Sequence, residues 1–343
     1  MSFSCVYCGE EIASGNPASG KVQLAGCPRC LNAFTISWVN GDPAPREIEN
    51  VERVDRLAPA GSVMAGVLGM LDEVLPQLPV LPHVPQRALA LIHDPLASMR
   101  QLADLVNEDA AISMKILRIC NSAMYMSTSE VKDLQLACAR LGMKTIANIT
   151  YAVTNGNLYR SPNPALRDLM EQMWRHAMAT AHAADALAEK TQGIDRSLPF
   201  IAGLIHDIGK LVLLDTLANK YKGPVGRLRQ TPELMIKAID LFHPTVGLQV
   251  VQYWRMPNEF AFSTYYGGTP DAVGEAQWRP LAHIVCLASA IADSSGFPIG
   301  EPTTELEGHA SVAALGLSQD VVTGVRDGLP ETVESLLNAL GAA

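Results

Sequence analysis

The stretch FIAGLIHDIGKLVL, residues 200–213, decides the fold. Its apolar side chains recur at helical spacing around the adjacent polar pair His206 and Asp207. Lys210 follows His206 by four positions, which places both on one face of a helix, where the lysine can meet a phosphate or pair with a carboxylate. We therefore predict one helix from Phe200 to about Leu217, with a polar site on it.

The chain on both sides of this stretch also has helical spacing. The 343 residues are 48% hydrophobic but only 6% aromatic, and small or unbranched side chains such as Ala, Leu and Met lose little freedom on a helix. Ser98 with Gln101 three positions later predicts a capping box at a helix start. Sustained alternation of apolar and polar residues ends near residue 40. The predicted fold class is mostly α, with a small β segment in front.

Four cysteines, Cys5, Cys8, Cys27 and Cys30, form two C-x-x-C pairs separated by 18 residues. This spacing predicts a structural zinc site, since four cysteine ligands leave no open position for catalysis. KVQLAG (21–26) and NAFTISWV (32–39) predict two strands that frame the site. A redox-active pair of dithiols is the alternative interpretation. The metal would supply most of the folding energy of so small a unit.

Composition shifts define the domain organisation. We expect a zinc ribbon in residues 1–40, a linker rich in Pro, Gly and charge in 41–66, and a helical domain in 67–343, with its central portion at about 165–300. The start lacks the features of a secretory signal and no run reaches 18 apolar residues, so we expect a cytoplasmic protein that does not enter a membrane.

Charge bears on the partners. A net charge of −9 disfavours broad attraction to nucleic acid. The first forty residues hold only Lys21 and Arg29 as basic side chains, against Glu10 and Glu11. We therefore expect the ribbon to contact a protein partner rather than a nucleic acid.

Several blocks appear in the order found in the HDOD family, the HD-related output domain of bacterial signalling proteins. The blocks are LPQLPVLPHVPQRALALIHDP (75–95), LADLVNEDAAISMKILRICNSAMYM (102–126), LACARLGMKTIANI (136–149), MWRHAMATAHAADALA (173–188), residues 200–213, and HPTVGLQVVQYWRMPNEFAFS (243–263). The chain resembles this family over roughly residues 70–343. The resemblance implies an all-helical two-lobe fold and a regulatory role.

The related HD phosphohydrolases use a His, a His-Asp pair and a later Asp as metal ligands. The resemblance therefore assigns a candidate divalent-metal site to His176, His206, Asp207 and Asp293, with Lys210 as a candidate phosphate contact. Aligned on LASAIAD (287–293), the usual position of the last Asp is occupied by Ser289, and Asp293 lies one helical turn later.

Three further positions bear on catalysis. Where catalytic HD-GYP relatives carry a His pair, this chain has Tyr265 and Tyr266, although His243 matches a histidine of that type. The expected function is a non-catalytic signalling module that binds a protein or a small ligand such as a nucleotide, with His176, His206 and Asp207 as a buried hydrogen-bonded cluster. The alternative is a mononuclear metal-dependent phosphohydrolase or phosphodiesterase that acts on a nucleotide.

Overall fold

A computed structural model describes the backbone of five strands between Ser2 and Glu47, and residues 81–122, 130–161, 163–217, 232–274, 276–299 and 306–341, together with 74, 76, 78 and 125. The chain divides into two compact units. The first contains Met1–Pro79 and Asp207–Tyr266, and the second contains Val80–His206 and Gly267–Ala343. The chain passes from the second unit into the first at the peptide bond between His206 and Asp207.

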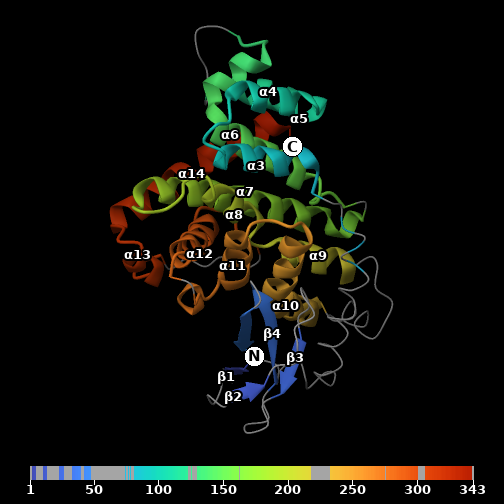
Figure 1. The fold of residues 1–343 in the computed structure, drawn as a ribbon, viewed down its shortest axis with the longest axis vertical. Helices are drawn as coiled ribbons and strands as arrows, with labels where there is room; N and C mark the ends of the chain where they lie inside the picture. The colour runs from blue at the N-terminus through green and yellow to red at the C-terminus, as the bar shows by residue number, and fades with distance from the viewer. Residues whose placement is uncertain are drawn as a thin grey trace. The chain divides into compact units, whose positions relative to one another are not determined.

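The N-terminal strands form two small antiparallel sheets, drawn as blue arrows in Figure 1. β1 (Ser2–Ser4) pairs with β2 (Glu11–Ala13), and β4 (Ala33–Val39) pairs with both β3 (Gln23–Gly26) and β5 (Asp42–Glu47). The two strands expected from the sequence are confirmed as β3 and β4. The four cysteines of the expected zinc site lie outside the described residues.

The third strand of the larger sheet, β5, lies in the segment that we expected to be a linker. Val39 pairs with Asp42, so only Asn40 and Gly41 separate the strands, and Asn-Gly is a strong signal for a two-residue hairpin. Pro43 and Pro45 suggested a linker, but proline is tolerated on a strand at the edge of a sheet, and β5 is such a strand. β5 thus occupies residues 42–47 of the segment 41–66.

The helices of the first unit that the structure describes are α9 (Ile208–Asp215), α10 (Pro232–Tyr253) and α11 (Asn258–Tyr266). The backbones of α9 and α10 approach closely at Gly209, where an added Cβ would lie 1.9 Å from the carbonyl oxygen of His243. Only glycine fits there, because every other residue places a carbon atom at that point. The HDIGK sequence thus sets the spacing between these two helices.

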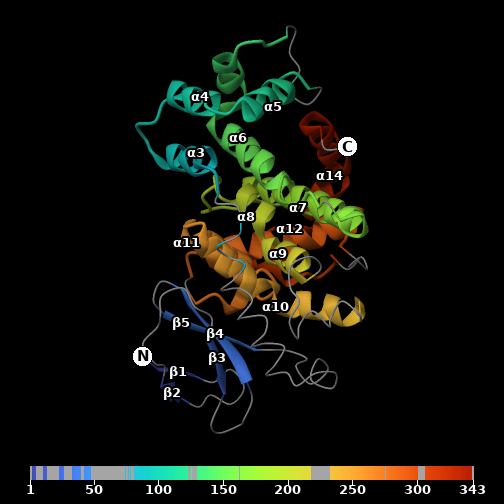
Figure 2. The same ribbon diagram turned by 90° about the vertical axis from the view of Figure 1, so that its right-hand side faces the viewer.

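The second unit is helical throughout its described part. It contains α3 (His83–His93), α4 (Met99–Asn107), α5 (Ala110–Cys120), α6 (Leu134–Gly156), α7 (Pro164–Lys190), α8 (Pro199–Ile205), the short 3-10 helix η5 (Pro270–Ala272), α12 (Arg279–Ser294), α13 (Ala310–Ala314) and α14 (Gln319–Leu340). The long helix α7 contacts α8, α12 and α14, and Figures 1 and 2 show it crossing the unit. Its Ala-rich inner face is buried, which permits close packing of these neighbours.

Two local motifs of the second unit follow from the sequence. The Ser98 side chain caps α4 and the Gln101 side chain reaches back to the backbone N–H of Ser98, which confirms the expected capping box. Asn121, at the end of α5, donates to the carbonyl oxygens of Leu117 and Val131 and accepts from the backbone N–H of Val131. One amide therefore joins the end of α5 to Val131 by two hydrogen bonds and to Leu117 by a third.

The single helix expected over residues 200–217 is wrong. α8 ends at Ile205 and α9 begins at Ile208, with Asp207 in a non-helical conformation (φ −102°, ψ 16°). Asp207 is the N-cap residue of α9, a position that Asp favours, although its side chain makes no capping hydrogen bond. Because the break falls between His206 and Lys210, the one-face argument for these two residues no longer holds.

Within the described residues, the helices are too short or too polar for any of them to cross a lipid bilayer.

Candidate functional site

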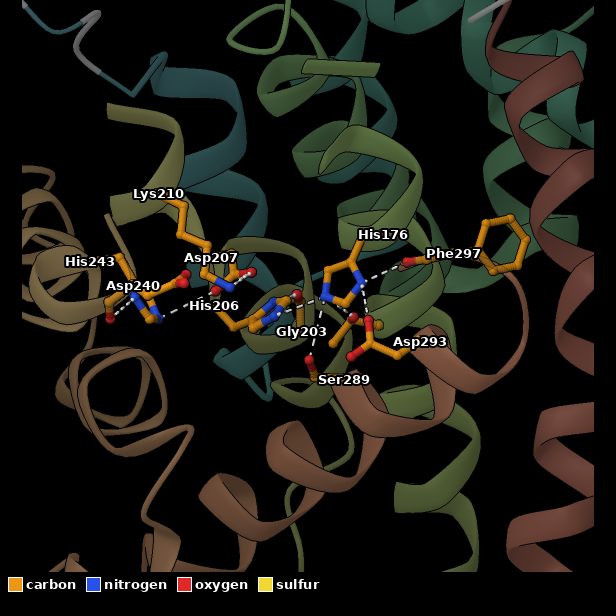
Figure 3. A network of polar contacts seen from close by, with 11 residues as sticks. His176, Gly203, His206, Asp207, Lys210, Asp240, His243, Ser289, Asp293 and Phe297 are labelled. Atoms are coloured by element: carbon orange, nitrogen blue, oxygen red, sulfur yellow. Dashed lines mark hydrogen bonds and ion pairs between the residues drawn. The ribbon is translucent and has the colours of Figure 1, made fainter. Parts of the chain in front are cut away.

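His176 is the centre of a buried polar cluster in the second unit (Figure 3). It lies on α7 and is 2% exposed. Its Nδ1 lies 2.9 Å from the carbonyl oxygen of Phe297 and 3.3 Å from Oδ1 of Asp293. Its Nε2 lies on the other side of the ring, 3.4 Å from the Thr180 hydroxyl. The ring is therefore held from two sides.

His206 faces His176 from the end of α8. Its Nδ1 lies 2.7 Å from the carbonyl oxygen of Gly203, and its Nε2 lies 3.3 Å from Nε2 of His176. The close approach depends on Gly203, because a Cβ at that position would lie 2.8 Å from the carbonyl oxygen of Thr180 on α7. His206 is 8% exposed, so the facing nitrogens are largely shielded from water.

These contacts determine which nitrogen of each ring carries a proton. A carbonyl oxygen only accepts hydrogen bonds, so Nδ1 of each histidine must carry a proton. In the neutral form each Nε2 then has a lone pair, and the two Nε2 atoms are 3.3 Å apart. Facing lone pairs repel each other unless a shared proton or a cation lies at that position. The two Nε2 atoms thus present acceptors to the same point, where the Thr180 and Ser289 hydroxyls also lie 3.4 Å from Nε2 of His176.

A second polar cluster belongs to the first unit and centres on Asp207, which is 5% exposed. Its Oδ2 lies 2.9 Å from the Lys210 ammonium, and its Oδ1 lies 3.6 Å from Nε2 of His243. His243 Nδ1 donates to the backbone oxygen of Asp240. Burial raises the pKa of the Asp240 carboxyl, the Lys210 charge opposes that rise, and the Asp207 charge adds to it.

Ser289 and Asp293, one turn apart on α12, contact different nitrogens of His176. The Ser289 hydroxyl lies 3.4 Å from Nε2, the nitrogen that faces His206. Asp293 Oδ1 lies 3.3 Å from Nδ1, on the opposite side of the ring. Ser289 therefore occupies the place that the sequence comparison gave to the fourth ligand. The structure does not bring Asp293 to the same side as the other candidates.

The donor set fits a divalent ion. His176, His206 and Asp207 each offer one ligand atom, and these atoms lie within 4.8 Å of one another. Asp207 follows His206 directly in the chain, so one turn supplies two of the three. Metal-bound histidines commonly donate their other N–H to a carbonyl or carboxylate, and both rings do so here. Imidazole and carboxylate suit zinc, iron or manganese.

Sequence reasoning missed several members of the cluster. The backbone carbonyls of Gly203 and Phe297 carry no sequence signal, because every residue has one. Thr180, four residues after His176 on α7, could have been found from its helical spacing. Tyr265 and Tyr266, noted for replacing a histidine pair, are buried and pack edge to face.

The comparisons with known proteins identify the family of the chain. The sequence pattern of the HDOD domain matches residues 78–270, more than half of the chain. The chain therefore belongs to the HDOD domain family. The solved structures that resemble it include proteins named for signal transduction and for phosphohydrolysis.

Individual relatives are distant. An uncharacterised protein of Treponema pallidum (strain Nichols) is 26% identical over 253 residues, which cover 71% of this chain and 46% of that protein, so the chain spans about half its length. An HDOD protein of unknown function from Geobacter sulfurreducens has a TM-score of 0.64 at 18% identity, over 79% of this chain and 97% of that one.

Two other solved structures carry provisional functional names. A Marinobacter aquaeolei VT8 protein named for signal transduction has a TM-score of 0.63 at 23% identity, over 86% of this chain and 66% of that one. A Shewanella amazonensis SB2B protein named as a metal-dependent phosphohydrolase has a TM-score of 0.55 at 20% identity, over 81% and 99% of the two chains. The TM-scores of these three structures establish a shared fold.

Proposed function

We propose that this chain is a non-catalytic regulatory module of a bacterial signalling pathway, in which the histidine pair forms a buried centre able to hold one divalent ion. The observation that carries the proposal is the burial of the ligands. His176, His206 and Asp207 are 2%, 8% and 5% exposed. A phosphoester substrate needs an open face on the metal, and these side chains present almost none to solvent.

The individual residues have distinct roles in this proposal. His176, His206 and Asp207 would hold the ion, and Asp293 and the Phe297 carbonyl would orient His176. Ser289 in the fourth position is a weaker ligand than an aspartate, which favours a single ion over a pair. Lys210 is already engaged by Asp207, which leaves it less free to bind a phosphate. A bound ion would stabilise the folded state, because it would replace the repulsion between the two lone pairs.

The alternative is a mononuclear metal-dependent phosphohydrolase, and the three convergent ligands are the observation in its favour. Three protein ligands also describe many catalytic metal sites. A bound ion would there acidify a water molecule and polarise a phosphoryl oxygen. The degenerate fourth ligand and the buried tyrosines favour the regulatory role.

A hydrolysis assay separates the two functions. The full-length protein would be incubated with Mn²⁺, Mg²⁺, Zn²⁺ or Fe²⁺ and a panel of linear and cyclic nucleotides, alongside the His206→Ala/Asp207→Ala variant. The regulatory proposal expects no difference between the two proteins. Turnover by the wild type that the double variant lacks would establish the phosphohydrolase instead.

For the N-terminal segment we propose a structural zinc ion on Cys5, Cys8, Cys27 and Cys30, and a protein as the partner of the ribbon. The proposal rests on the cysteine spacing and on the scarcity of basic residues there. A cytoplasmic location fits the same inference, since free thiolates are maintained in reducing compartments.

A further inference from the structure

A cavity in the second unit lies apart from the histidine pair, between α5, α6, α7 and α14. Its volume is about 620 Å³, within the range of pockets that bind small ligands. Residues of all four helices line it, and α14 contacts both α5 and α7. We refer to it as the α5–α14 pocket. Nothing in the HD-type site uses these residues.

The walls of the α5–α14 pocket are cationic. Four basic side chains line it, against one acidic side chain, Glu171; the four are Lys115, Arg160, Arg167 and Arg175. Arg118 adds a fifth positive charge beside the pocket residue Gly341, because its guanidinium lies 2.8 Å from where a Cβ of that glycine would be. This concentration of positive charge occurs in a chain of net charge −9.

These cations are largely uncompensated within the part of the chain that the structure describes. Arg175 pairs with Glu334, whereas Lys115, Arg160 and Arg167 form no ion pair with a described residue. The pKa of Lys115 is lowered, first by burial and then by the charges of Arg118 and Arg160. Like charges gathered without counter-charges cost stability, and a bound anion would remove that cost.

The floor of the pocket is apolar and aromatic. Trp174 and Tyr159 contact each other with ring centroids 5.3 Å apart. Gly156 packs closely against the Trp174 ring, where a Cβ would lie only 3.2 Å from the indole, and both residues line the cavity. Ala152 and Leu337 complete the apolar surface. The lining of the pocket thus combines apolar and aromatic side chains with cationic ones.

We propose that the α5–α14 pocket binds a small phosphorylated molecule with a planar ring, the chemistry of a nucleotide. The phosphates would contact Lys115 and Arg160, and the ring would lie against Trp174. A cavity of this size admits one such ligand, and the negative charge of the whole chain disfavours a long polyanion. The pocket would be the ligand site of the regulatory module. Its biological role rests on the proposed regulatory function, whereas its binding chemistry does not.

The test uses isothermal titration of the full-length protein with ATP, pyrophosphate and adenosine. We expect one ATP per chain, weaker binding of pyrophosphate, and affinity that falls with added salt because the contacts are ionic. The Lys115→Ala/Arg160→Ala variant should bind ATP at least about tenfold more weakly. The matched control is Arg100→Ala/Lys132→Ala, which removes two exposed positive charges of the same unit and should leave affinity unchanged.

The His206→Ala/Asp207→Ala variant distinguishes this pocket from the histidine site. The proposal requires that this variant bind ATP as the wild type does, whether or not the histidine site holds a metal. Loss of ATP binding in that variant would place the ligand at the histidines and overturn the proposal. Equal binding by the Lys115→Ala/Arg160→Ala variant and its control, or no binding of any of the three probes, would overturn it as well.

Discussion

Asp293 Oδ1 lies 3.3 Å from Nδ1 of His176, on the opposite side of the ring from the nitrogen that faces His206. The carboxylate thus has the position of a group that orients a metal-binding histidine, not of a ligand to the same ion. Together with the Phe297 carbonyl it keeps the proton on Nδ1, so that Nε2 presents its lone pair to the site.

Replacing Asp293 by Asn should therefore weaken metal binding without abolishing it. The substitution removes the negative charge beside His176. Loss of such an orienting carboxylate typically lowers metal affinity about 10- to 100-fold. Competition with a chromophoric chelator measures the affinity. Asp104→Asn, an exposed residue of α4, is the control and should change nothing. Complete loss of the ion in Asp293→Asn would identify Asp293 as a ligand and contradict the assignment.

The close contact at Gly209 predicts opposite effects of two Gly→Ala substitutions. Gly209→Ala places a Cβ 1.9 Å from the His243 carbonyl oxygen and should lower the free energy of unfolding by at least about 2 kcal/mol. Gly324→Ala, on the exposed side of α14, meets nothing within 4 Å and should raise it by about 0.5 kcal/mol, since Ala favours a helix. Urea unfolding measures both. Equal effects would show that α9 and α10 can separate freely.

The buried His182 predicts a dependence of stability on pH. Burial lowers its pKa from 6.5 to about 4, so between these values the unfolded chain binds a proton that the folded chain does not. The contribution of neutral His182 to stability is therefore complete above pH 6.5 and is lost as the pH falls toward 4. Between about pH 7.5 and pH 5 the loss should reach about 2 kcal/mol.

Urea unfolding at the two pH values, for wild type and His182→Leu, isolates this residue from the other histidines. Leu has a similar volume and no titratable group, so the variant should lose about 2 kcal/mol less than the wild type over the same interval. Parallel losses in the two proteins would mean that His182 is protonated in the folded state.

Much of the helical domain could be predicted because its determinants are local or motif-based. The Ser98–Gln101 capping box follows from residue types at a fixed spacing. The pairing of His176 with the HD motif was implied by the resemblance to the HD phosphohydrolases. The break between Ile205 and Ile208 could not be predicted from propensity, since neither Gly nor Pro marks it. It is fixed by tertiary contacts, namely the packing of Gly203 on α7 and of Gly209 on α10.

The side chains of the candidate site could be predicted from the sequence, but the atoms through which they contact one another could not. Sequence identified His176, His206, Asp207 and Lys210, and the helical turn between Ser289 and Asp293. Ser289 and Asp293 face different nitrogens of His176. This choice depends on how α12 is rotated against α7, and the spacing of residues along one helix does not determine that rotation. The α5–α14 pocket is built from helices distant in sequence, so no short motif indicates it.

The most direct test of the central claim is the metal content per chain, measured by elemental analysis on protein purified without chelators. We predict two ions in the wild type, one in His206→Ala/Asp207→Ala and one in Cys27→Ser/Cys30→Ser, with circular dichroism to confirm that the helical domain of each variant is folded. A single ion in the wild type that persists in the His206→Ala/Asp207→Ala variant would contradict the account. It would reduce the histidine pair to a hydrogen-bonded link, through a shared proton, between α7 and α8.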